Sequence, residues 1–85
     1  MADITQERMD QEADYFANVA APRSDEAAAD GERVAADETR SDHTRACAAR
    51  AAEIARGNAT EYRAIAAALR EGEIPDCLDL EALTD

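Results

Sequence analysis

The chain has 85 residues, enough for one domain, and carries 20 acidic residues against nine Arg and no Lys, a formal net charge of -11. A net negative charge of this size repels phosphate groups, so the composition argues against direct binding of DNA or RNA. No apolar run approaches the roughly 20 residues of a membrane span, and the first residues lack the features of a signal peptide. We therefore expect a cytoplasmic protein with no membrane association.

The charge falls in blocks along the chain. Residues 1–42 have a net charge of -8, residues 43–70 of +3 and residues 71–85 of -6. Ala supplies 22 of the 85 residues, and only about fourteen larger apolar side chains remain to offset the chain entropy. We expect a single acidic domain over residues 1–85 with a sparse core, or one that needs a partner chain to complete it.

The first predicted element is a helix over about residues 4–20. Asp3 is placed to cap it, and Gln6 at the third helical position would complete a capping box. Pro22 is expected to end this helix or to separate it from the next. Its apolar face consists of residues at helical spacing: Met9, Ala13, Phe16 and Ala20.

Ser24 is expected to begin a second helix, with Asp25 and Glu26 in the first turn facing the positive end of its dipole. Gly31 weakens this helix by about 1 kcal/mol relative to Ala. Residues 37–45 contain no apolar side chain, which fits either a solvated helical segment or a turn between helices. A break in this stretch is favoured, because a single straight helix would have to bury two different faces.

Residues 42–71 favour one long, bent helix closed by Gly72. The alternative is a division at Gly57, because Gly57 suits a helix end and Asn58 with Glu61 forms a capping box. The predicted apolar stripe of this helix consists of Cys47, Ala51, Ile54, Asn58, Tyr62, Ile65 and Leu69.

Pro75 and Asp76 are expected to open a last short helix over about residues 77–83. β-Branched residues are sparse and no strand-like alternation occurs. The sequence therefore predicts an all-α protein, a small antiparallel bundle of three to four helices whose basic central helix lies against acidic ones.

No catalytic constellation is visible, and one His does not make a triad without partners that the sequence does not indicate. His43 and Cys47 are four residues apart, which is half of a zinc site. Cys77 with an Asp such as Asp76 or Asp79 could supply the other ligands if the C-terminal residues fold back. The simpler interpretation is that Cys47 is a small core residue and His43 faces solvent. We expect no catalytic residue, no metal site, no cofactor and no enzymatic activity.

The only basic surface is a series of Arg side chains on the third predicted helix. These side chains could grip an acidic partner or phosphate, but pairing with the acidic helices of the same chain is the favoured interpretation. The series consists of Arg45, Arg50, Arg56, Arg63 and Arg70.

Acidic side chains at i, i+4 and i+7 on a helix are about 5–6 Å apart, a spacing close enough to that of phosphates to compete for rows of Lys and Arg. Tyr15 lies beside one acidic run and could anchor an interface, although packing within the protein is the favoured role. The candidate partner-binding residues are Asp10, Asp14, Tyr15, Glu26, Asp30, Glu32, Asp37 and Glu38.

In size, acidity and helix content the chain resembles the small phage-encoded inhibitors of host defence, including anti-CRISPR proteins that act as nucleic-acid mimics. The resemblance covers the whole chain as a class and rests on no motif. It implies a protein of the host-cell cytoplasm whose partner is a basic nucleic-acid-binding protein or complex, such as a CRISPR effector, with its DNA or RNA groove blocked by acids.

The alternative is a self-associating structural or regulatory helical protein whose acidity reflects genome composition or adaptation to high salt. A homodimer would complete the sparse core. The small side chains that would allow close helix approach are Ala48, Ala52, Ala55, Ala59 and Ala66.

Overall fold

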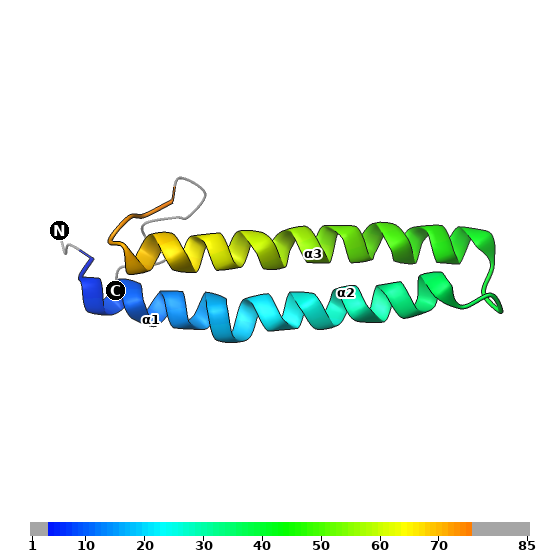
Figure 1. Ribbon diagram of the computed structural model, residues 1–85, viewed down its shortest axis with the longest axis horizontal. Helices are drawn as coiled ribbons and strands as arrows, with labels where there is room; N and C mark the ends of the chain where they lie inside the picture. Colours follow the sequence, from blue (N-terminus) through cyan, green and yellow to red (C-terminus); the bar gives the residue numbers. More distant parts are fainter. Residues whose placement is uncertain (1–3, 76–85) are drawn as a thin grey trace.

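The computed structural model describes residues 4–75, which form a long helical hairpin (Figure 1). Helix α1 (Gln6–Tyr15) continues through a π-helical segment, η1 (Phe16–Ala20), into α2 (Ala21–Ala36), and α3 (Asp42–Arg70) returns antiparallel beside all three. The long axis measures 55 Å and the other two 19 and 18 Å.

The all-α prediction is confirmed for these residues. The described part contains two long antiparallel rods, α1–η1–α2 and α3, rather than three to four helices. The helix predicted over residues 77–83 lies outside the described residues.

Helix α1 begins at Gln6 because the Thr5 hydroxyl accepts a hydrogen bond from the Arg8 N–H at 3.1 Å. The prediction of Asp3 as the cap is therefore wrong. The Gln6 side-chain amide instead reaches across to the end of α3, where it donates to the carbonyl of Leu69 at 3.0 Å. The last four carbonyls of a helix have no partners inside the helix. A side chain at the start of α1 therefore caps the C-terminus of α3.

Pro22 lies inside a continuous helical rod, and the predicted separation at Pro22, with a new helix beginning at Ser24, is wrong. Proline lacks an N–H, and its ring clashes with the carbonyl four residues earlier in a regular α-helix. Immediately before Pro22 the backbone widens, because the Ala21 N–H bonds to the carbonyl of Phe16, five residues back. We attribute the uninterrupted helix to this widening, which makes room for the ring.

Alanine lines the contact between the two rods at seven-residue intervals, the period of a coiled coil. Ala13 lies eight residues before Ala21, and the extra residue of η1 restores the register. Ala52, Ala59 and Ala66, which were expected to allow close approach of a second copy, are buried within the hairpin itself. The buried alanines are Ala13, Ala21, Ala28, Ala52, Ala59 and Ala66.

The rods lie close together at Gly31. A Cβ placed on Gly31 would lie 2.9 Å from the backbone oxygen of Ala48 and 3.1 Å from the Cβ of Ala52. Because only small side chains fit this half of the contact, the predicted stripe is wrong there and its larger members lie at the surface. The exposed members are Cys47, Ala51, Ile54 and Asn58.

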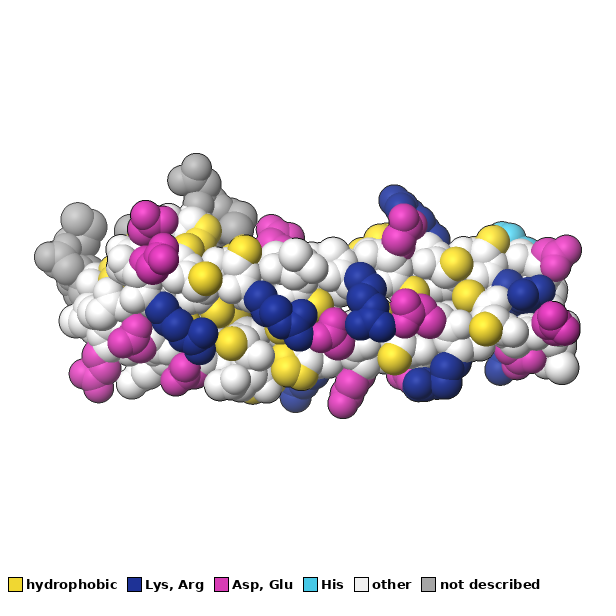
Figure 2. Space-filling model, viewed as in Figure 1, with side chains coloured by type: hydrophobic (Ala, Val, Ile, Leu, Met, Phe, Trp, Pro, Cys, Tyr) yellow, Lys and Arg dark blue, Asp and Glu magenta, His cyan; other side chains and the backbone are white. Residues whose placement is uncertain are grey.

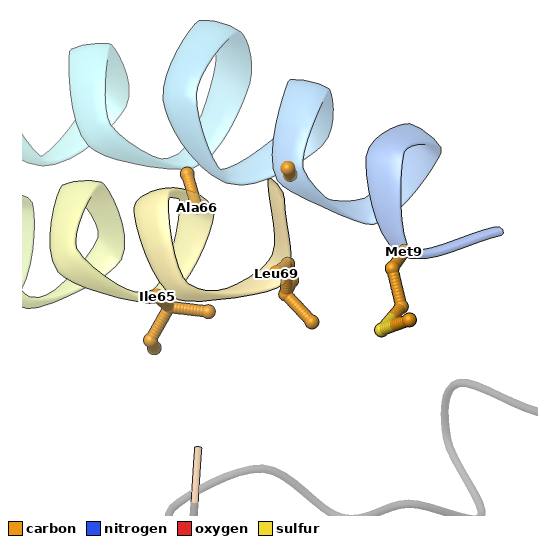
Figure 3. Close-up of a cluster of buried hydrophobic side chains, with 5 residues drawn as sticks. Met9, Ile65, Ala66 and Leu69 are labelled. Atoms are coloured by element: carbon orange, nitrogen blue, oxygen red, sulfur yellow. The ribbon is translucent and has the colours of Figure 1, made fainter. Parts of the chain in front are cut away.

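The larger apolar side chains gather at the end of the hairpin that holds the termini of the described chain. Figure 3 shows Met9, Ile65 and Leu69 pointing to the same side of the hairpin. Leu69 is the only large side chain among the described residues that is fully buried. Phe16 stacks on Tyr62 with ring centroids 5.8 Å apart. The predicted core positions Met9, Ala13, Ile65 and Leu69 are confirmed, and Phe16 and Tyr62 are partly buried against them. The prediction of Ala20 is wrong, because the extra residue of η1 shifts the register and Ala21 is buried instead.

A tight turn over residues 37–41 joins the rods, which confirms the predicted break. The Asp37 carboxylate accepts hydrogen bonds from the backbone N–H and the hydroxyl of Thr39, and the Ser41 hydroxyl caps α3. Helix α3 then runs without interruption through Gly57, as favoured. Gly72 has a positive φ of 84° just past its end.

Candidate functional site

One side of the hairpin, the ionic side, is built from ion pairs between the two rods. In Figure 2, which faces this side, Arg side chains lie across the seam next to acidic ones. The pairs confirm that these Arg side chains bind acids of the same chain. They are Arg56 with Asp25 at 3.2 Å and Glu32 at 2.6 Å, Arg63 with Asp25, and Arg70 with Asp14 at 3.2 Å.

The remaining Arg side chains of α3 are also engaged. Arg45 donates from Nε to the carbonyl of Ala35 at 2.8 Å, near the end of α2. Arg50 pairs with Glu53 one turn further along its own helix at 3.1 Å. The whole Arg series is thus held by groups of the same chain, which reduces its ability to attract phosphate.

Asp25 is the centre of the ionic side, because it accepts hydrogen bonds from both Arg63 and Arg56. The hydrogen bond from Arg63, reinforced by Arg56, holds the pKa of the Asp25 carboxyl below its ordinary value. Hydrogen bonding to Glu32 raises the pKa of Arg56 in the same way. The Arg side chains are exposed and Asp25 is half-buried, so each pair is screened by solvent and adds little stability.

Asp25 was not among the predicted site residues. Its expected position at the start of a separate helix explained its charge without any partner. A signal was present, because Asp25 and Glu32 are seven residues apart, as are Arg56 and Arg63. Equal spacing on two antiparallel helices allows such rows to meet.

Three predicted partner-binding residues are used within the hairpin. Asp14 and Glu32 belong to the ionic side described above. Asp10 accepts a hydrogen bond from the Gln6 amide at 2.8 Å. All three are exposed, but each has a neighbour in the same chain that satisfies part of its charge or hydrogen-bonding capacity.

Other predicted residues lie on the rod surface that points away from α3, which we call the outward face. At 3.6 residues per turn, Glu26 and Asp30 lie opposite the fully buried Ala28, and Tyr15 lies opposite Ala13. The exposed Arg23 and Arg33 lie on the same surface of α2, so the two acids are accompanied by two Arg. The outward face consists of Tyr15, Arg23, Glu26, Asp30 and Arg33.

The outward face carries one local ion pair, between Asp30 and Arg33. The predicted Asp37 lies in the turn after α2, where it pairs with Arg40 at 3.5 Å. The hydrogen bonds from Thr39 lower the pKa of Asp37. Within residues 4–75, Glu26 forms no ion pair.

Tyr15 on the outward face is partly packed, and one predicted residue, Glu38, remains. Tyr15 is 49% exposed and packs edge-on against Phe16, with ring centroids 5.8 Å apart. Glu38 is exposed in the turn between α2 and α3, away from the outward face.

The possible zinc ligands do not form a cluster in the described chain. Cys47 Sγ lies 3.6 Å from His43 Nε2, and Cys47 is exposed rather than part of the core. Over residues 4–75 no three His, Cys, Asp or Glu side chains are grouped as metal ligands would be. Cys77, the other predicted contributor, lies outside the described residues.

Comparisons of the chain with protein-family models, curated proteins and solved structures find no match. None of the helices in the described part combines the length and apolar character needed to cross a membrane.

Proposed function

We propose that the protein is a small acidic binding protein that occupies the basic DNA- or RNA-binding surface of a larger protein or complex, such as a CRISPR effector. It acts as a nucleic-acid mimic and inhibits by occupancy, without catalysis, cofactor or metal. The observation that supports this most directly is the neutralisation of the α3 Arg series inside the hairpin, because it leaves acids to dominate the remaining surface.

The net charge of the hairpin bears on such competition. Residues 4–75 hold 15 acidic residues and nine Arg, a net charge of -6, which along a 55 Å axis is one net negative charge per about 9 Å, against one per about 3.4 Å on a single nucleic-acid strand. The net charge density of the hairpin is thus lower than that of a strand. Charge would steer the encounter and make it sensitive to salt, while additional contacts would have to supply specificity.

The outward face supplies both kinds of contact. Glu26 and Asp30 are one turn apart and point away from α3, so they can meet Lys or Arg side chains without disturbing the hairpin. Tyr15 offers a half-exposed ring on the same rod, and aromatic rings are favoured anchors in interfaces. We therefore assign partner binding to the outward face, while Asp14 and Glu32 maintain the hairpin.

The test is affinity capture with the tagged full chain from host lysates at about 0.1 M and about 0.5 M salt, because charge interactions are screened as salt rises. We expect a nucleic-acid-binding complex to be recovered at low salt and lost at high salt. The captured complex is then titrated with labelled DNA or RNA in the presence of the chain, which should displace the nucleic acid.

Two double variants of equal charge locate the surface. Glu26→Arg with Asp30→Arg reverses the outward face and should abolish displacement. Glu53→Arg with Glu61→Arg reverses the charge of two exposed acids of α3. This control variant should still displace most of the nucleic acid. Circular dichroism shows whether each variant keeps its helix content. Equal displacement by the folded outward-face variant and the native chain would contradict the assignment.

A further inference from the structure

Apolar burial is divided unequally between the two halves of the hairpin. We call residues 23–56 the turn half, and residues 4–22 with residues 57–75 the terminus half (Figure 1). The terminus half holds all the large buried side chains of the described chain, which are Met9, Ile65 and Leu69. In the turn half the buried side chains are those of Ala28 and Ala52 alone. Because the free energy of burial follows the apolar area removed from water, the turn half gains much less from packing than the terminus half.

The helices of the turn half depend on this packing to stay folded. The turn half consists of residues 23–36 of α2, residues 42–56 of α3 and the turn between them. Each helical segment is close to the length of about 12–15 residues below which an isolated helix is marginal in water. Gly31 weakens the α2 segment further. If the two segments separate, they should therefore lose much of their helical structure.

Both rods contain a residue that weakens a helix at the level where the two halves meet. In the first rod this residue is Pro22, which lacks an N–H and follows the widened backbone of η1. In α3 it is Gly57. Pro22 lies within one turn of Asp25 and Gly57 is next to Arg56, so the ion pair between Asp25 and Arg56 brings both to nearly the same level. The helices can thus separate beyond this level while the core of the terminus half stays packed.

Polar contacts hold the two segments of the turn half together. Arg56 pairs with Asp25 at 3.2 Å and with Glu32 at 2.6 Å. Near the turn, Arg45 donates a hydrogen bond to the Ala35 carbonyl. The Arg56 and Glu32 side chains are about half exposed, so solvent screens their interaction and the contact can break and re-form at little cost.

We propose that the turn half opens as a unit while the terminus half stays folded, and that Arg56 supplies the main contact that keeps it closed. Opening separates Asp25 and Glu32 from their Arg partners, and so exposes two carboxylates that the closed hairpin neutralises. The core around Leu69 is kept, because all its members belong to the terminus half. Such partial opening is expected where a segment has few buried apolar contacts.

Amide hydrogen exchange of the full chain, resolved by residue with NMR, tests the proposal. Four buried alanines allow a comparison between like residues, Ala28 and Ala52 in the turn half with Ala13 and Ala66 in the terminus half. The two amides of the turn half should be protected at least about tenfold less, because they exchange without global unfolding. Equal protection at all four would mean that the hairpin unfolds as one unit, which overturns the proposal.

Two variants with the same substitution test the part played by Arg56. Arg56→Gln removes the pairs between the rods and should speed exchange at the two turn-half alanines about two- to tenfold, without changing the other two. Arg50→Gln removes the same charge from α3 but breaks only a pair with Glu53 in that helix, and should leave all four rates nearly unchanged.

Circular dichroism on the two variants shows whether helix content is kept. Equal acceleration of the turn-half amides by Arg50→Gln and Arg56→Gln would overturn the assignment of the closing contact to Arg56. The measurement uses the chain alone, so its outcome does not depend on whether a partner is captured.

Discussion

Gly31 of α2 lies so close to the backbone of Ala48 on α3 that a Cβ on the glycine would come within 2.9 Å of the Ala48 carbonyl oxygen. A backbone oxygen cannot move aside as the end of a flexible side chain can. The spacing of the two rods therefore depends on the absence of a side chain at this residue. Gly57, on the exposed surface of α3, has no atom within 4 Å of the same position.

The two glycines should respond in opposite ways to the same substitution. Gly31→Ala forces the rods apart and should lower the free energy of unfolding by about 1–3 kcal/mol, despite the better helix propensity of Ala. Gly57→Ala meets no neighbour and should raise it by about 0.5–1 kcal/mol. Urea unfolding followed by circular dichroism measures both. Stabilisation by Gly31→Ala would show that the rods are not held this close.

Leu69 should be the most sensitive apolar residue of the hairpin. It is fully buried and packs with Met9 and Ile65, so Leu69→Ala removes buried methyl groups and leaves a cavity. We expect a loss of about 2–5 kcal/mol in the free energy of unfolding. Ala64→Ser, at an exposed site on the same helix, serves as the control and should change it by less than about 0.5 kcal/mol. A small effect of Leu69→Ala would place the core elsewhere.

The stability of the hairpin should depend on the N–H donor of the Gln6 side chain. Gln6→Glu keeps the shape but removes the N–H donor that reaches the Leu69 carbonyl, and it brings a carboxylate next to Asp10. A loss of about 0.5–1.5 kcal/mol or more in the free energy of unfolding is expected. The same change at Gln11, exposed on the same helix, is the matched control. Equal effects at the two positions would mean that the contact between Gln6 and α3 contributes nothing.

The lowered pKa of the Asp25 carboxyl should make the stability of the hairpin depend on pH. Because its folded-state pKa is lowered by Arg63 and Arg56, its contribution is complete above the ordinary Asp pKa of about 3.9 and is lost as the pH falls through the folded value. Thermal melts of the native chain and Asp25→Asn should therefore differ at pH 7 and converge in acid. High salt should also reduce the difference.

Glu61→Gln provides the comparison, since Glu61 forms no ion pair within the described part of the chain. Its melting temperature should follow that of the native chain throughout the titration. A constant difference between Asp25→Asn and the native chain at all pH values would show that Asp25 acts through packing and not through its charge.

Tyr62, Ile65 and Leu69 lie on the face of α3 that packs against the first rod, as their spacing predicts. Large apolar side chains at helical spacing identify a buried face, and these were placed correctly. The turn before Asp42 was placed as well, because Ser41 can cap a helix and the preceding residues lack apolar groups. Each of these features depends on neighbours in the sequence.

The other half of the contact could not be found in this way. Ala repeats on several faces of α3, so the burial of Ala52 and the exposure of Ala51 are not distinguished by residue type. The predicted apolar stripe was placed on the wrong face of α3 because it included Ile54, and a large apolar side chain usually lies in the core. Here the close approach at Gly31 leaves no room for it.

The helical class, the turn and the excess of acid follow from the residues alone, because propensity, capping and charge are properties of single residues and their neighbours. The packing of the two rods is needed to explain why Pro22 continues a helix, why Asp25 meets Arg56 and Arg63, and why alanines form the seam. These features depend on where the second rod lies. For alanine the energy differences between faces are small, so the packing of one rod on the other selects among them.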